Sequence, residues 1–176
     1  GFPSTSPAPK EDFAARRDGK FSPPAVWFPY SLAKSVSGIE TIPDDRFGPF
    51  QGQMLAGDFQ NAIVTRVMLE KVNGEWQGAV FPFAKGFGSG VNRLAMGPDG
   101  KLYVGGLKNK AWAAVAPREW SLDRVSYTGK VPFEVKEVHV LKDGLELTFT
   151  QPVAAAVGGN PDSYDVVQFG FQYHEK

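Results

Sequence analysis

The chain has 176 residues, 42% of them hydrophobic, and its 19 basic and 19 acidic residues cancel. That length accommodates one domain or two small ones with an apolar core. A balanced charge creates no overall field that would attract nucleic acid or an acidic membrane surface. The absence of cysteine excludes disulfides, thiolate metal sites and cysteine nucleophiles. No apolar run approaches the roughly 18 residues of a membrane span, and no secretion signal is visible, so we expect a soluble chain.

The composition favours short strands over helices. Twenty glycines and 14 prolines accompany 14 phenylalanines, 5 tyrosines and 4 tryptophans, a mixture typical of strands joined by tight turns. The first 25 residues contain five prolines and no sustained periodicity. Residues 1–25 are therefore predicted to form an extended arm or linker.

Three strands of an antiparallel meander are predicted in the first half of the chain, over Gln53–Asp58, Ala62–Glu70 and Glu75–Pro82. The pair Asn73-Gly74 separates the last two strands. This dipeptide is typical of a type I′ hairpin, because both central residues must adopt positive φ.

A second meander is predicted over Val91–Met96, Lys101–Gly106 and Ser121–Tyr127. Its first two strands are joined by Gly97-Pro98-Asp99-Gly100, in which proline presets the turn and glycine closes it. We expect Gly100 to need a positive φ, so that valine at this position should harm folding.

The two meanders match one another as an internal repeat. We align 38–48 with 90–101, 52–59 with 100–107, and Arg66 with Arg124, at offsets of 52, 48 and 58 residues. A repeat of about 50 residues with three or four strands and a Gly-Pro-Asp-Gly turn is typical of a β-propeller blade. Two blades cannot close a ring. Residues 26–128 are therefore predicted to be two blades whose remaining neighbours come from the same parent protein or from another chain.

A different pattern begins after Gly129. Alternating apolar residues predict strands over Val135–Leu141 and Leu145–Thr150, and another over Tyr164–Tyr173 after the turn at Asn160-Pro161-Asp162. These strands are typical of the opening of an immunoglobulin-like sandwich, which has about seven. Residues 131–176 are thus predicted to be an incomplete Ig-like β-strand unit.

Four segments carry a resemblance to a known family: 24–44, 48–83, 90–106 and 122–153. Together they resemble the late blades of glucose/sorbosone dehydrogenase-like propellers, above all those in large exported multidomain proteins of planctomycete-type bacteria, which often add a c-type haem domain. The resemblance implies an all-β fold with blades of a six-bladed propeller and a periplasmic or extracellular location. It also implies oxidation of a sugar or aldehyde, with electrons passed to a quinone or haem located elsewhere.

The resemblance does not place a cofactor on this chain. Family members that bind pyrroloquinoline quinone (PQQ) carry two arginines, one residue apart, before the Gly-Pro-Asp-Gly turn, and these hold the carboxylates of the cofactor. Gly90 and Asn92 stand at those positions here, and Arg93 is one residue out of register. PQQ with calcium, or a haem, is thus expected only in the parent protein. Catalytic residues are expected outside this chain, and no metal ligands are assigned.

Five residues are candidates for ligand binding. Asn92 and Arg93 begin a strand that would line the propeller channel, where ligands bind. Asp58 and Asn61 form a polar cluster at a strand end that could hold sugar hydroxyls. Trp112 lies in the loop 107–119 and could stack on a sugar ring, although large flat side chains also serve packing between blades.

Other polar residues are interpreted structurally. The aspartates that stand beside glycine or proline, such as Asp99, are expected to cap turns rather than bind calcium. Arg66 and Arg124 are expected to pair with carboxylates of an adjacent blade. His139 and His174 have no recognisable nucleophile or metal partner. The alternative to an oxidoreductase is a non-catalytic propeller module that binds a glycan or a protein partner, and the fold alone does not choose between them.

Overall fold

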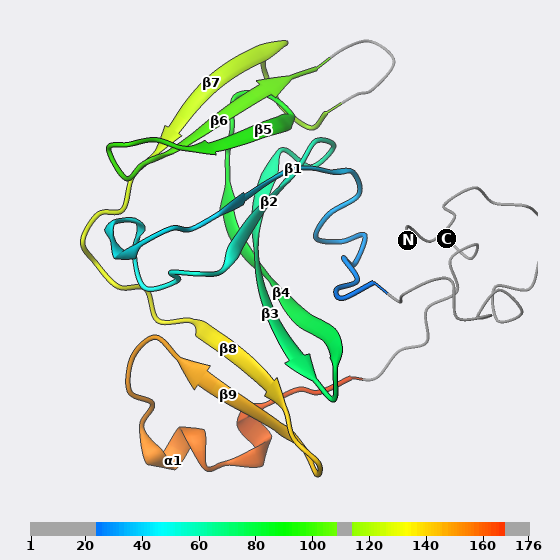
Figure 1. Ribbon diagram of the computed structural model, residues 1–176, viewed down its shortest axis with the longest axis vertical. Coiled ribbons are helices and arrows are strands. Elements are labelled where there is room, and N and C mark those ends of the chain that lie inside the picture. The colour runs from blue at the N-terminus through cyan, green and yellow to red at the C-terminus, as the bar shows by residue number, and fades with distance from the viewer. Residues whose placement is uncertain (1–23, 109–113, 168–176) are drawn as a thin grey trace, which may run out of the picture. The chain divides into compact units, whose positions relative to one another are not determined.

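The computed structural model describes residues 24–108 and 114–167, and antiparallel strands dominate it (Figure 1). The chain divides into two compact units. One comprises 25–151 and contains every strand of the described residues. The described part of the other, residue 24 and 152–167, contains two short helices. The predicted all-β class is confirmed. The arm predicted over 1–25 lies, except for its last two residues, outside the described part of the chain.

The first four strands form one antiparallel sheet in chain order, which we call sheet A: β1 Val36–Thr41, β2 Met54–Asp58, β3 Ile63–Val72 and β4 Glu75–Lys85. The three strands predicted for this meander are therefore confirmed, and β1 adds a fourth. Asn73 and Gly74 have φ of 50° and 90°. Both values are positive, as the predicted type I′ hairpin requires.

The next three strands form sheet B, also antiparallel and in chain order: β5 Val91–Met96, β6 Leu102–Leu107 and β7 Trp120–Val125. All three correspond to predicted strands. In the turn between β5 and β6, the backbone N–H of Gly100 donates to Gly97 O at 3.0 Å, and Gly100 has a φ of 72°. The turn is thus closed by a residue in the left-handed region, which glycine enters without a steric penalty.

Replacing Gly100 with valine is expected to lower the free energy of unfolding by about 1 to 3 kcal/mol, because a β-branched residue is strained at positive φ. Crowding adds to the effect, since a Cβ at this position would lie 3.0 Å from Arg46 Cβ. Thermal unfolding measures the change. Gly144→Val is the control, because a Cβ there meets nothing within 4 Å and the backbone does not have positive φ. Equal melting temperatures for the two variants would contradict the prediction.

Strand pairing confirms most of the internal repeat and corrects one part. Leu55 pairs with Arg66 in sheet A, and Tyr103 pairs with Arg124 in sheet B, so the offsets of 48 and 58 residues coincide in one register. The offset of 52 for the first strands is wrong. Thr41 pairs with Met54 as Met96 pairs with Leu102, which gives an offset of 55. The difference arises because β1 and β2 are joined by a longer loop with the 3₁₀ turn η1, Asp45–Phe47.

The two sheets pack face to face through their first strands. A Cβ on Gly57 of β2 would collide with Val91 Cγ1 of β5, so the absence of a side chain there allows the close approach. Ser37 of β1 bridges the sheets, with its Oγ 2.7 Å from Val91 O and 3.1 Å from Gly57 O. One core therefore spans both sheets and comprises Ile42, Phe47, Phe50, Leu55, Val64, Phe87, Val91, Leu94, Leu102 and Val104.

A hairpin of β8 Val135–Val140 and β9 Leu145–Phe149 follows, as predicted, within the same compact unit. The boundary expected at residue 131 falls between β7 and β8 inside that unit. The rings of Phe133 and Phe149 stack at the base of the hairpin, with centroids 5.6 Å apart.

The strand predicted over 164–173 is not found in its described part, because 164–167 belong to no strand. Instead the other unit contains α1 Ala155–Gly158 and the 3₁₀ turn η2 Pro161–Ser163. The side chain of Asn160 accepts a hydrogen bond from Asp162 N at 3.1 Å, which confirms the predicted turn. Tyr164 then donates its hydroxyl to Gly158 O at 3.0 Å, a local contact that folds the chain back on itself. Residues 168–173 lie outside the described residues.

Candidate functional site

Asp58 and Asn61 lie together, as predicted, but their polar groups are used within the chain. Asp58 Oδ1 accepts a hydrogen bond from the backbone N–H of Asn61 at 2.6 Å. Its Oδ2 accepts from the backbone N–H groups of Lys34, at 2.8 Å, and Ser35. Asn61 Nδ2 donates to Leu32 O at 3.2 Å. The fully buried carboxylate therefore fixes the segment before β1 to the connection between β2 and β3.

Asn92 and Arg93 lie elsewhere, on the edge strand β5 of sheet B. A β-bulge interrupts the pairing between Val91 and Arg93, so that Asn92 is the additional residue. Arg93 is exposed, and its Nη1 donates to Asn92 O at 3.0 Å and lies 3.4 Å from Asn92 Oδ1. This guanidinium faces solvent on a bulged edge, so it is accessible to a ligand. Trp112 and His174, also considered from the sequence, lie outside the described residues.

The residues present do not fit PQQ or a calcium ion. A Cβ on Gly90, at the first of the two positions where the resembled family has arginine, would lie 2.5 Å from Phe59 O, so backbone already fills that space. Asn92, at the second position, is neutral. Within 24–108 and 114–167, no group of three or more histidine, aspartate or glutamate side chains could hold a metal ion. The anionic cofactor would find no positively charged pair at these two positions.

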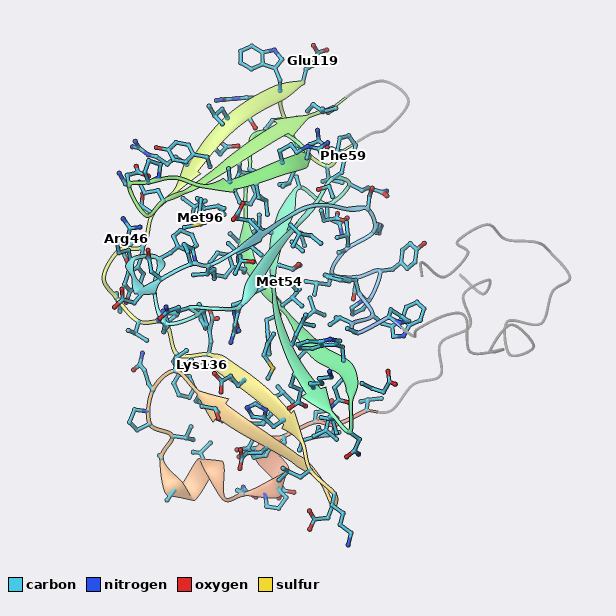
Figure 2. The ribbon with its side chains drawn as sticks, in the orientation of Figure 1. Arg46, Met54, Phe59, Met96, Glu119 and Lys136 are labelled. Carbon is cyan, nitrogen blue, oxygen red and sulfur yellow. The ribbon has the colours of Figure 1, made fainter. Side chains whose placement is uncertain are left out.

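Arg66 of β3 forms the most elaborate polar site of the described chain. Its guanidinium is fully buried between the rings of Phe50 and Phe81, whose centroids lie 3.9 Å and 4.1 Å from Arg66 Cζ. Nη2 donates to Val135 O at 2.6 Å, and Nη1 donates to Lys136 O at 3.0 Å and to Gln53 Oε1. Arg66 thus joins sheet A to the start of β8, where Figure 2 labels Lys136.

The electrostatic setting of Arg66 is unusual for a surface-type side chain. Burial lowers the pKa of Arg66 to about 10, while the carboxylate of Glu134, 3.9 Å from Nη2, acts in the opposite direction. The group therefore stays charged at neutral pH, and its Nε has no hydrogen-bond partner. The prediction that it pairs with a carboxylate of the adjacent blade is wrong, because its closest partners are carbonyl oxygens of β8 and Gln53. The apolar neighbours on β3 do not reveal this in the sequence.

A second polar cluster joins the same hairpin to the far end of β3. His139 Nδ1 lies 2.8 Å from Glu70 Oε2, and its Nε2 lies 3.4 Å from Glu137 Oε2. Glu70 Oε1 also accepts from Gln77 Nε2 at 2.8 Å and from Val140 N at 3.0 Å. The hydrogen bond from His139, followed by those from Gln77 and Val140, lowers the pKa of Glu70 to about 2. The bond to Glu70 raises the pKa of His139.

These shifts predict a pH-dependent stability. Because the pKa of His139 is raised on folding, its contribution is complete below the ordinary value of about 6.5 and is lost as pH rises through the folded pKa. Glu70 has a lowered pKa, so its contribution is lost only as pH falls toward about 2. His139→Gln should therefore lower the melting temperature at pH about 5 and leave it nearly unchanged at pH about 9. A loss of equal size at both pH values would contradict the ion pair.

One face of sheet B is exposed and largely apolar. Cross-strand pairing places Arg93, Gly105 and Leu122 in one row, with further rows on either side. Trp120 and Leu122 expose 77% and 75% of their surface, although both lie in β7. We call this surface the outer face of sheet B and define it by Arg93, Ala95, Tyr103, Gly105, Leu107, Trp120, Leu122 and Arg124. Large exposed apolar side chains in one patch mark an interaction surface.

Comparison with protein-family models, with curated proteins and with solved structures gives no match for the chain. In the described ranges 24–108 and 114–167, no helix has the length and apolar character needed to cross a membrane. The functional argument therefore depends on the contacts of the chain itself.

Proposed function

We propose that this chain supplies two consecutive blades, sheets A and B, to a six-bladed propeller of the sugar or aldehyde dehydrogenase type that acts in the periplasm or outside the cell. The hairpin β8–β9 would open an Ig-like unit beside them. The observation that carries the proposal is the common register of the two meanders, in which Leu55 pairs with Arg66 as Tyr103 pairs with Arg124. A shared register over successive meanders that pack face to face is characteristic of blades.

In this proposal the chain is a scaffold, and the oxidation occurs on residues outside it. The hydrogen-bonding groups of Asp58, Asn61 and Arg66 contact the chain itself, and the described part has no metal-binding cluster. The quinone or haem that accepts electrons would be held by the remaining blades or by a further domain. Those blades, from the same parent protein or another chain, are the partners that the proposal requires.

An activity assay on two polypeptides tests the proposal. A longer polypeptide that carries these 176 residues together with further blades should reduce a redox dye when given an aldose, PQQ and calcium, and its EDTA-treated form should not. The 176-residue chain alone should not reduce the dye. If the longer polypeptide is also inactive across sugars and aldehydes, with PQQ and with haem, the dehydrogenase function is contradicted.

A non-catalytic binding module is the second candidate, and the exposed Trp120 favours it. Indole rings on an open face stack on sugar rings or bury against a protein partner. Titration of the chain with oligosaccharides should then change the tryptophan fluorescence, and Trp120→Ala should abolish the change. Trp76→Ala provides the control, because Trp76 is also exposed but lies on β4, away from sheet B.

A further inference from the structure

The contact between sheets A and B is a joint whose two halves recur, unfilled, at the ends of the pair. At the joint, Gly57 and Val64 of sheet A face sheet B, and Val91 of sheet B lies against Gly57. Val64 and Val91 are fully buried in the shared core. Each of these positions has a counterpart in the other sheet, given by the strand pairing of the repeat.

Sheet B repeats the receiving half of this joint. Gly105 is the counterpart of Gly57, and Leu122 is the counterpart of Val64. Both belong to the outer face of sheet B. A Cβ on Gly105 would meet no atom closer than 3.9 Å, and Leu122 is 75% exposed where Val64 is fully buried. The surface that receives a neighbouring sheet is therefore present on sheet B without a neighbour.

Sheet A repeats the inserting half. With the offset of 55 residues, Val36 and Ile39 of β1 are the counterparts of Val91 and Leu94 of β5. Val91 and Leu94 are 0% and 9% exposed, whereas Val36 and Ile39 are 42% and 60% exposed. Ile39 pairs with Ala56, so it lies on the face of sheet A opposite the one that receives Val91.

We propose that separate copies of this chain associate head to tail, with β1 of one copy packed on the outer face of sheet B of the next. Val36 of one copy would then lie over Gly105 of its neighbour, as Val91 lies over Gly57 within the chain. This inference depends on the repeat that underlies the proposed function. A second copy is the occupant because this chain itself carries both complementary halves, and its equal numbers of acidic and basic residues oppose no self-association.

The interface is heterologous, since two different surfaces meet. Each added copy leaves one receiving and one inserting surface free, so association continues until the ends meet in a ring or continues without closure. An isologous dimer through Trp120 and Leu122 would instead stop at two copies. The two arrangements can be distinguished with variants that block one surface at a time.

Sedimentation velocity of the full chain over a wide concentration range tests the proposal. The mass of the unmodified chain should rise with concentration. Leu122→Glu blocks the receiving surface and Ile39→Glu blocks the inserting surface, because each buries a charge at the contact, so each variant alone should associate at least about tenfold more weakly. An equimolar mixture of the two variants should form a one-to-one dimer and nothing larger, since only one compatible pair of surfaces remains.

Leu145→Glu is the matched control, because Leu145 is exposed on the hairpin β8–β9 and should associate like the unmodified chain. A chain that stays monomeric at every concentration overturns the proposal. So does self-association of Ile39→Glu alone, which would indicate an isologous contact. The dehydrogenase assay on the longer polypeptide does not depend on these results, so a monomeric chain together with dye reduction would overturn only this inference.

Discussion

Replacement of Arg66 with methionine is expected to lower the free energy of unfolding by about 3 kcal/mol or more. Methionine fills part of the space between Phe50 and Phe81 but donates no hydrogen bond. The carbonyl oxygens of Val135 and Lys136 would then lose their partner in a buried place, where an unsatisfied polar group is costly. The loss arises from these stranded acceptors more than from the removed charge.

Arg124 offers a matched control from within the same chain. It is the repeat counterpart of Arg66 and occupies the same register against β6, but it is exposed. Arg124→Met should therefore change the free energy of unfolding by less than about 0.5 kcal/mol. Urea denaturation of both variants at neutral pH, followed by circular dichroism, compares them directly. Equal stability of the two variants would contradict the buried anchor.

Hydrogen exchange gives a second readout of the same prediction. If Arg66 holds the hairpin β8–β9 on sheet A, amides of β8 should lose protection in Arg66→Met by more than those of β5 or β6. Arg66→Lys should show the same pattern in weaker form, because a lysine keeps the charge but lacks the planar fork that reaches two carbonyls at once. Uniform loss of protection over all strands would instead indicate global destabilisation without a special role for β8.

The local structure was predictable because each signal depends on neighbouring residues. The Asn73-Gly74 hairpin and the turn that ends at Gly100 follow from backbone conformations that few residues adopt. Strand alternation placed the meanders correctly for the same reason. The offset of the first strands was wrong because matching Gly38 to Gly90 aligned residue types, whereas strand register depends on the length of the loop between β1 and β2.

What could not be predicted depends on position in the stack of sheets. Arg66 and Arg124 have similar neighbours in sequence, yet one is buried and the other exposed, because only sheet A is covered on that face. Asp58 and Asn61 were correctly expected to lie together. Their partners at 32–35 are backbone groups from a distant segment, which no residue pattern reveals. Their role in ligand binding, like that of Asn92 and Arg93, stays a prediction.

Replacement of Gly57 with alanine is expected to destabilise the fold by about 2 kcal/mol, because the new methyl group enters the space of Val91 in a packed core. The same substitution at Gly105 should change the free energy of unfolding by less than about 0.5 kcal/mol, since a Cβ there has room. Thermal and urea unfolding of dilute samples measure both. Equal losses in the two variants would show that the joint between the sheets does not depend on Gly57.

The two glycines also connect stability with association. If the outer face of sheet B receives β1 of another copy, the methyl group of Gly105→Ala meets Val36 of that copy as the methyl group of Gly57→Ala meets Val91 within the chain. Gly105→Ala should then fold as stably as the unmodified protein and yet associate more weakly at high concentration. A variant that is unchanged in both respects would mean that Gly105 is glycine for reasons unrelated to the repeated joint, and the open end of the stack would lose its complementary surface.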